Sequence, residues 1–191
     1  EMLYPGSRFR MADDLLETYL RQLIEAHAGS PEVTVAWQGG EPTMMGVDFF
    51  RRSVELAEKH RMPHQRIMYT IQTNATLIDD DWAAFFKEQE VLVGVSIDGP
   101  REIHDTYRVD KGGKGSFDRV MAGLGHLREH DVAWNALTTI HAANQDRGRE
   151  VYRFLRDECD ARFMQFIPIV ERATSETLPV ANEGWGEGVK G

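Results

Sequence analysis

Hydrophobic positions along the chain follow two alternating spacings, one typical of helices and one typical of strands. From Met11 to Ala28 the apolar residues recur every three or four positions, which predicts an amphipathic helix. The short apolar run Val33–Trp37 predicts a buried strand. Helical spacing returns at about Val47–His60, and the next strand-like run is Arg66–Ile71.

The alternation continues through the second half of the chain. Asp79, Asp80 and Asp81 suit the N-terminal cap and first turn of a third helix. The segment His104–Gly115 is polar and glycine-rich, which predicts a long loop. The remaining predicted strands and helices are Val91–Ile97, Ala133–Ile140, Arg162–Ile169, Phe117–His130 and Gly148–Asp157. Five strands interleaved with five helices predict an α/β fold with parallel strands and right-handed crossovers.

Composition and charge narrow the class of protein. The chain has 191 residues, 41% of them hydrophobic and 28% charged, as expected for a globular domain with its own core. A net charge of −9 argues against general binding to nucleic acid or anionic membranes. The single cysteine, Cys159, rules out an internal disulfide framework and cannot hold a metal cluster by itself. We expect a reducing, cytoplasmic setting.

Polar and glycine residues gather where the predicted strands end. Two adjacent glycines in Gln38–Pro42 let the backbone turn tightly and approach a ligand. The other polar strand ends are Gln72–Asn74, Ser96–Pro100 and His141–Asn144. Because ligands of parallel α/β folds sit at the C-terminal ends of the strands, we expect one binding edge there.

These strings, in this order, resemble the radical S-adenosylmethionine enzymes, and specifically the anaerobic sulfatase-maturating branch. The resemblance runs from about Met11 to Gly184, and the whole set of strings is more specific than Gly-Gly-Glu-Pro alone. The matching strings are Trp37-Gln38-Gly39-Gly40-Glu41-Pro42-Thr43, Ile71-Gln72-Thr73-Asn74-Ala75-Thr76-Leu77, Val95-Ser96-Ile97-Asp98-Gly99-Pro100, His104-Asp105-Thr106-Tyr107-Arg108, Gly115-Ser116-Phe117 and Gln165-Phe166-Ile167-Pro168-Ile169-Val170-Glu171.

The resemblance implies a partial (β/α)6 TIM-like radical S-adenosylmethionine barrel over residues 1–171, followed at 172–191 by a linker or the start of an auxiliary-cluster domain. The family's Cys-x3-Cys-x2-Cys loop and its auxiliary-cluster cysteines are absent from these residues. We therefore expect a fragment that lacks the first strand, the cluster loop and the catalytic acid, and that is inactive as given. Its unpaired strand edge near Val33–Trp37 predicts dimers or poor solubility.

The resemblance also implies which residues bind the cofactor. Gly40 would contact the amino group of S-adenosylmethionine through its backbone, and Arg108 would bind the carboxylate with its fork of donors. Ser96 would contact the ribose or the amino-acid moiety, and Ile169 would pack against adenine. The complete predicted set is Gln38, Gly39, Gly40, Glu41, Asn74, Ser96, Arg108 and Ile169, with no catalytic residue and no metal ligand in this chain.

In the family, a [4Fe–4S] cluster reduces S-adenosylmethionine, and the resulting radical removes a hydrogen atom from Cβ of a cysteine or serine in a sulfatase. The product is Cα-formylglycine. The resemblance therefore implies a sulfatase polypeptide with a Cys/Ser-x-Pro-x-Arg motif as substrate, and ferredoxin or flavodoxin as electron donor.

Several candidates also have a purely structural interpretation. The Gly39-Gly40 pair suits a tight turn without a ligand, Glu41 suits a cap on the second helix, and Asn74 suits a turn whose backbone it satisfies. Ser96 suits a small residue on a buried strand.

Other polar residues are interpreted as structural. Arg108 suits a surface ion pair with Asp105 or Asp110. His104 and Asp105 point apart as neighbours, which favours local hydrogen bonds over a metal or acid–base pair. Acidic neighbours make Cys159 inert. We see no ligand spacing among the seven histidines and predict no metal site.

Two other functions remain open. One is a different peptide modification by a member of the same superfamily, because the cofactor motifs say little about the substrate. The other is a cluster-free α/β binding module, which the cysteines of the source gene would discriminate. An unrelated TIM-barrel hydrolase lacks support, since the chain shows no paired-carboxylate or nucleophile pattern.

Overall fold

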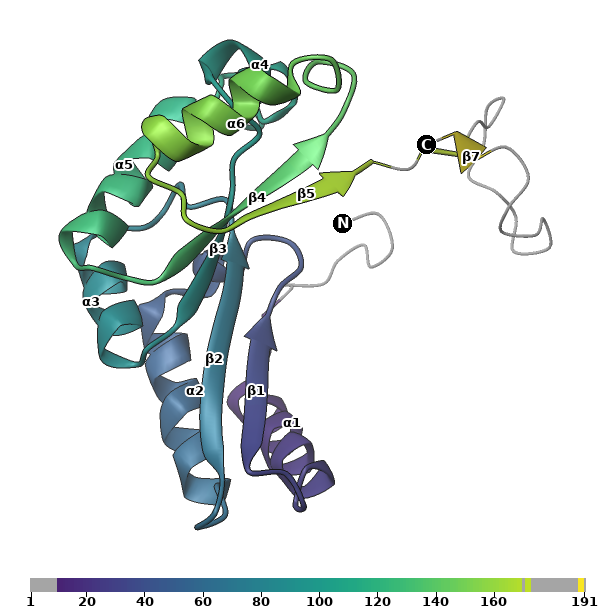
Figure 1. Cartoon of the computed structure of the whole chain (residues 1–191). Coiled ribbons are helices and arrows are strands. Elements are labelled where there is room, and N and C mark those ends of the chain that lie inside the picture. Colours follow the sequence, from purple (N-terminus) through teal and green to yellow (C-terminus); the bar gives the residue numbers. More distant parts are fainter. Residues whose placement is uncertain (1–9, 170, 173–188, 191) are drawn as a thin grey trace. The chain divides into compact units, whose positions relative to one another are not determined.

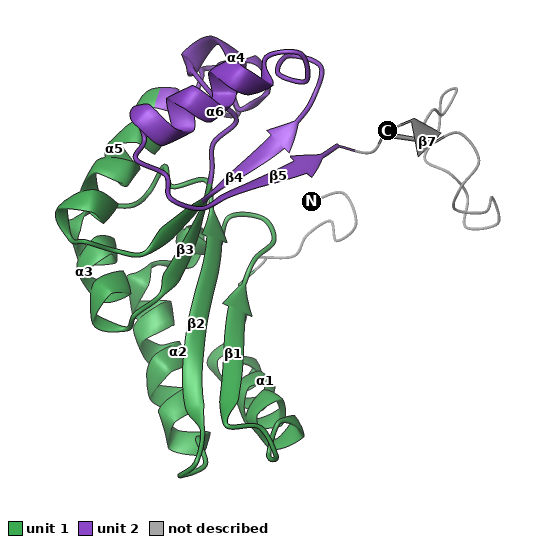
Figure 2. Cartoon of the chain, in the orientation of Figure 1, with its two compact units in different colours: residues 1–95, 118–135 green, residues 96–117, 136–191 purple. Residues whose placement is uncertain are grey.

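The computed structural model describes residues 10–169, 171–172 and 189–190. Helices and strands alternate along these residues (Figure 1), and the chain divides into two compact units (Figure 2). Unit one comprises residues 1–95 and 118–135, and unit two comprises residues 96–117 and 136–191. No helix among the described residues is both long and apolar enough to cross a membrane.

Unit one contains the first three strands, which pair in parallel. Residues Glu32–Trp37 lie beside Arg66–Ile71, and Thr70–Thr73 lie beside Leu92–Val95. The carboxyl ends of the three strands therefore meet at one edge. In chain order its elements are α1 (Asp13–Ala26), β1 (Glu32–Trp37), the 3-10 helix η1 (Pro42–Met45), α2 (Val47–His60), β2 (Arg66–Thr73), α3 (Asp80–Glu88), β3 (Leu92–Ser96) and α5 (Phe117–Glu129).

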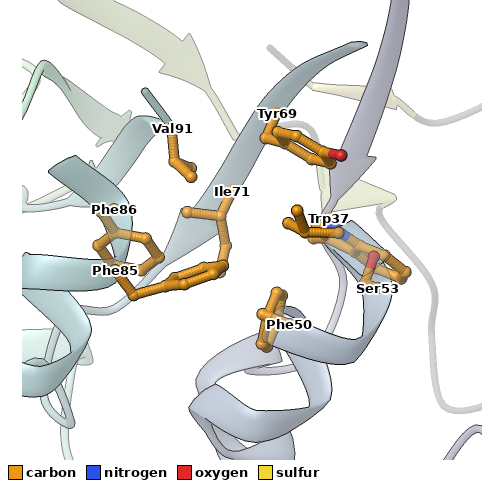
Figure 3. Close-up of a pocket in the computed structure, with 9 residues that line it drawn as sticks. Trp37, Phe50, Ser53, Tyr69, Ile71, Phe85, Phe86 and Val91 are labelled. Atoms are coloured by element: carbon orange, nitrogen blue, oxygen red, sulfur yellow. The ribbon is translucent and has the colours of Figure 1, made fainter. Parts of the chain in front are cut away.

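Aromatic side chains of α2 and α3 form the core against β1 and β2 (Figure 3). Phe50 packs edge-on against Trp82, with ring centroids 5.2 Å apart. The cavity left among the side chains shown in Figure 3 has a volume of only about 10 Å³, room for roughly one water molecule. Two buried hydroxyls, of Ser53 and Tyr69, make no hydrogen bond within the described chain. These aromatic side chains thus belong to the core between helices and sheet.

Gly123 of α5 lies directly against the loop that follows β2. A Cβ at this position would stand 2.2 Å from the carbonyl oxygen of Ala75. Because this oxygen belongs to the backbone, no side-chain rotation can relieve the clash. We expect Gly123→Ala to lower the free energy of unfolding by about 1–3 kcal/mol or more, through overpacking. Urea denaturation measures this change.

Gly125 provides the matched control, because it lies on the same helix with no atom within 4 Å of a Cβ built there. Gly125→Ala is expected to raise the stability by about 0.5–1 kcal/mol, through helix propensity alone. Equal effects of the two substitutions would contradict the close packing of α5 on the Ala75 loop.

Unit two contains a second parallel pair, in which Ala136–Ile140 lie beside Met164–Pro168. Antiparallel pairing joins Glu171–Arg172 to Val189–Lys190. Most of the predicted linker at 172–191 and Val170 of the last matching string lie outside the described residues. The elements of unit two are α4 (Arg101–Tyr107), β4 (Trp134–Ile140), α6 (Gly148–Asp157), β5 (Met164–Pro168), β6 (Glu171–Arg172) and β7 (Val189–Lys190).

One predicted element is wrong. The first part of the expected loop His104–Gly115 belongs to helix α4, which begins after Pro100. Ile103 and His104 are both fully buried in this helix. The polar character of the segment hid the helix, because His104 is buried through hydrogen bonds rather than through hydrophobicity. The N-terminal cap of α3 is confirmed, since the Asp79 carboxylate accepts from the backbone N–H of Trp82 at 3.1 Å.

Candidate functional site

The loop after β1 presents its backbone to solvent. Gln38, Gly39 and Gly40 are all exposed. The two glycines have φ angles of +93° and +57°, which side-chain-bearing residues rarely adopt. A Cβ on either would meet nothing within 4 Å, so conformation rather than crowding requires glycine here. This glycine loop, Gln38–Gly40, leaves peptide groups accessible to a ligand.

Glu41 holds the glycine loop to the end of β2. Its Oε1 accepts from the N–H and hydroxyl of Thr43 at 3.1 and 2.6 Å and from the hydroxyl of Thr73 at 2.7 Å. Its Oε2 accepts from the N–H of Asn74 at 2.7 Å. The predicted cap on the second helix is therefore wrong: Glu41 caps η1 instead. All four hydrogen bonds are internal, so this carboxylate shapes the loop.

Asn74 is occupied by the turn that follows it. The Oδ1 atom accepts from the N–H and the hydroxyl of Thr76, at 3.0 and 2.8 Å. The turn interpretation of Asn74 is thus confirmed for its carbonyl oxygen. The structure brings this predicted site residue next to Glu41 through its backbone, since both belong to unit one.

Arg108 forms a fork-shaped ion pair with Asp98 in unit two. Nε lies 2.5 Å from Asp98 Oδ2, and Nη2 lies 3.0 Å from Oδ1. Thr139 completes the arrangement: its N–H donates to Asp98 Oδ1 at 2.8 Å, and its hydroxyl accepts from Arg108 at 3.3 Å. The Asp98 side chain is only 2% exposed, whereas that of Arg108 is 27% exposed. The predicted pairing of Arg108 with Asp105 or Asp110 is wrong.

One end of the Arg108 guanidinium remains available. Of its five N–H groups, the two on Nη1 make no hydrogen bond to any described residue. Arg108 lines the arginine pocket, a cavity of about 560 Å³, within the range of small-molecule sites. Ile169 lines this pocket too, whereas Ser96 is half-buried and does not. The pocket residues are Asp98, Tyr107, Arg108, Thr139, Ile140, His141, Ala142, Gln145, Pro168 and Ile169.

A chain of hydrogen bonds through buried side chains holds the backbone of Arg108. The N–H of Asp98 donates to His104 Nδ1 at 3.3 Å, so the imidazole proton resides on Nε2 and points to the Ser116 hydroxyl at 3.0 Å. That hydroxyl donates to the carbonyl of Arg108 at 2.8 Å. Burial, with the charge of Arg108, lowers the pKa of His104 to about 4. Asp105 separately accepts from the N–H of Phe117 at 2.9 Å, so both residues make structural hydrogen bonds, with partners 6 to 12 residues away rather than with close neighbours.

Sequence reasoning missed the polar residues that support Arg108. Asn144 donates to the carbonyls of Asp98 and Thr139, at 3.2 and 2.8 Å. His141 is buried, and its Nε2 lies 3.7 Å from Asp98 Oδ2. Asp98, His141 and Asn144 belong to the polar strand ends named from the sequence, and Thr139 lies near the end of β4. Nothing in their spacing marks Asp98 as a buried anion.

Known proteins similar to this chain identify its family. The sequence profile of the "Radical SAM superfamily" matches residues 4–155. A serine-type anaerobic sulfatase-maturating enzyme of Bacteroides thetaiotaomicron is 42% identical over 86% of this chain and 39% of its own length. A cysteine-type enzyme of Clostridium novyi is 40% identical over 83% of the chain and 41% of its own length. The chain thus spans about two fifths of these relatives.

Solved structures lead to the same family. The structure of native anSMEcpe with bound AdoMet has a TM-score of 0.80 and 34% identity, covering 85% of this chain and 44% of that one. The same enzyme with AdoMet and the Kp18Cys peptide has a TM-score of 0.79 and 35% identity, over 83% of this chain and 43% of that one. These likenesses confirm the predicted α/β fold as part of a radical SAM barrel. With the profile match across most of its length, the chain belongs to the radical SAM superfamily.

Proposed function

We propose that the arginine pocket of unit two binds S-adenosylmethionine, and that the glycine loop of unit one by itself suits the same ligand. The observation that carries this proposal is the free Nη1 end of Arg108 in a cavity that Ile169 also lines. A guanidinium edge suits the carboxylate of the cofactor, and an apolar wall suits its adenine. The exposed peptide groups of Gly39 and Gly40 suit its ammonium. Solved relatives with bound AdoMet support the assignment. Ser96, at the end of β3, remains a proposed polar contact to the ribose or the amino-acid moiety of the cofactor.

The residues present do not fit an iron–sulfur cluster. Such clusters take three or four cysteine ligands, and the 191 residues contain one cysteine, Cys159, which is buried. When bound elsewhere in the whole protein, the cluster would supply the electron that starts radical chemistry on the cofactor. The residues of this chain would bind the cofactor, hold its carboxylate and keep water from its sulfonium side.

For the whole protein we propose oxidation of a cysteine or serine of a sulfatase to Cα-formylglycine. The relatives are named as cysteine-type and serine-type enzymes of this activity, and one is solved with a peptide. A peptide with the Cys/Ser-x-Pro-x-Arg motif would be the substrate, and ferredoxin or flavodoxin the electron donor. A different peptide modification remains the second candidate, because the described pocket contacts the cofactor rather than the substrate.

Arg108→Lys tests the cofactor site in the 191-residue chain. Lysine keeps the charge but cannot hold Asp98 and a ligand carboxylate at once. We expect the affinity for S-adenosylmethionine, measured by titration calorimetry, to fall about tenfold. Arg149→Lys, an exposed arginine outside the pocket, should leave it unchanged. Equal affinity of wild type and Arg108→Lys, with both folded by circular dichroism, would contradict the role of Arg108.

The activity is tested separately with protein expressed from the complete reading frame. After anaerobic reconstitution with iron and sulfide, it is given S-adenosylmethionine, dithionite and a Cys-x-Pro-x-Arg or Ser-x-Pro-x-Arg peptide. We expect an aldehyde that a hydrazide reagent traps, located by mass spectrometry at the cysteine or serine. Cleavage of S-adenosylmethionine without formation of an aldehyde would support the proposed cofactor site but contradict the proposed sulfatase reaction.

A further inference from the structure

A second group of ionisable side chains lies in unit one, outside the glycine loop and the arginine pocket. Asp80 occupies the first turn of α3, His126 lies in the last turn of α5, and His130 directly follows that helix. The two helices lie side by side (Figure 1), and both belong to unit one (Figure 2). Sequence analysis overlooked the spacing of this pair: residues four apart on a helix share one face.

The side-chain atoms converge on one point. His126 Nδ1 and His130 Nε2 donate to the same oxygen, Asp80 Oδ1, at 2.9 and 3.2 Å. These two bonds lower the pKa of Asp80 from its ordinary value. A carboxylate oxygen of Glu129 is also near: ligand atoms of Asp80, His126 and Glu129 lie within 4.8 Å of one another.

The distances match those of a shared metal ion. Tetrahedral zinc with bonds of 2.0–2.1 Å separates neighbouring ligand atoms by about 3.3 Å. The distance of 2.9 Å between His126 Nδ1 and Asp80 Oδ1 is near that value, and the ligand atoms of Asp80, His126 and Glu129 lie within 4.8 Å of one another, so a small movement of these side chains would close them on one ion. The side chains of His126, His130 and Asp80 are 33%, 31% and 72% exposed, which leaves an entry path and room for a water ligand.

The chemistry of the donors selects the kind of ion. Imidazole nitrogens suit zinc, nickel, copper and cobalt, whereas magnesium and calcium prefer an all-oxygen set. One imidazolium would be enough to pair with the Asp80 carboxylate. The imidazole of His126 between the carboxylates of Asp80 and Glu129 forms a mixed nitrogen–oxygen donor set of this kind. We propose that Asp80, His126 and Glu129 bind a divalent transition-metal ion, best matched by zinc, with water as the fourth ligand, while His130 holds the Asp80 carboxylate in place.

Such an ion would fasten the start of α3 to the end of α5. The test uses the 191-residue chain with zinc chloride in titration calorimetry, and with cobalt chloride in visible absorption as a probe of tetrahedral nitrogen–oxygen coordination. We expect one ion per chain. We also expect the melting temperature to rise by about 5–10 °C at a hundredfold excess over Kd.

The variants assign the ligands. His126→Ala and Asp80→Asn should each weaken zinc binding by about tenfold or more, and His126→Ala/Glu129→Gln should abolish the cobalt spectrum. His64→Ala removes an exposed histidine outside the group and should change neither. Melting without metal verifies that each variant is folded. Zinc binding that survives His126→Ala/Glu129→Gln, falls equally in His64→Ala, or is absent up to millimolar zinc would overturn the proposal and leave a plain ion pair.

Discussion

Arg108→Ala is expected to lower the free energy of unfolding by about 3–5 kcal/mol, because it leaves the Asp98 carboxylate buried without its cation. Asp98 is 2% exposed, so water cannot take the place of the guanidinium. Asp98→Ala should cost less, about 3 kcal/mol, since the Arg108 side chain left behind is 27% exposed and can reach water. Urea denaturation followed by circular dichroism measures both values.

Arg149→Ala is the control for loss of an arginine, and Asp146→Ala is the control for loss of an acid; both residues are exposed. Each control is expected to change the stability by less than about 0.5 kcal/mol. The predicted order of the two stability losses, larger for Arg108→Ala than for Asp98→Ala, is as informative as their size. If Asp98→Ala proved more harmful than Arg108→Ala, the buried carboxylate would not be the group that needs the partner.

Stability is expected to fall by roughly 3 kcal/mol as the pH is lowered from about 6.5 to about 4, because of His104. In the unfolded chain His104 takes up a proton below its ordinary pKa of 6.5. In the folded chain burial lowers this pKa to about 4, with the charge of Arg108 adding to burial and those of Asp98 and Asp105 opposing it. Between these values only the unfolded state is protonated, so acid favours unfolding. Above pH 6.5 the contribution is constant.

Urea denaturation at a series of pH values measures this dependence as the slope of stability against pH. His104→Gln should remove about one proton from that slope, and His27→Gln, at an exposed position, should not. Acids whose folded pKa is lowered, such as Glu17 and Asp80, keep their full contribution above their unfolded pKa near 4, and so act below this window. An unchanged slope in His104→Gln would refute the assignment.

Much of the fold was predictable because hydrophobic spacing dictates it. The bounds of α2 and α6 match the prediction, and the other predicted helices and strands differ by one or two residues at an end. Helix α4 was missed because it is short and its buried His104 is polar. No local pattern carries that information, since the partners of His104 lie 6 and 12 residues away.

The candidate site was predictable only in part. The conformation that Gly39 and Gly40 adopt follows from the residue type, and the resemblance of the strings to a family located Arg108. The partner of Arg108 did not follow, because Asp98 also depends on Thr139, 41 residues further along the chain. His126 and His130 carried a readable signal, their spacing of four, but Asp80 joins them only through the packing of two helices.

The carboxylate of Glu41 has a consequence for how this chain can vary. It receives hydrogen bonds from the loop after β1 and from the residues that end β2, so two segments distant in sequence depend on one side chain. A change at Thr73 removes one of the four hydrogen bonds to this carboxylate, and a change at Glu41 removes all four. We therefore expect substitutions at the two positions to be coupled, so that the effect of one depends on the residue at the other.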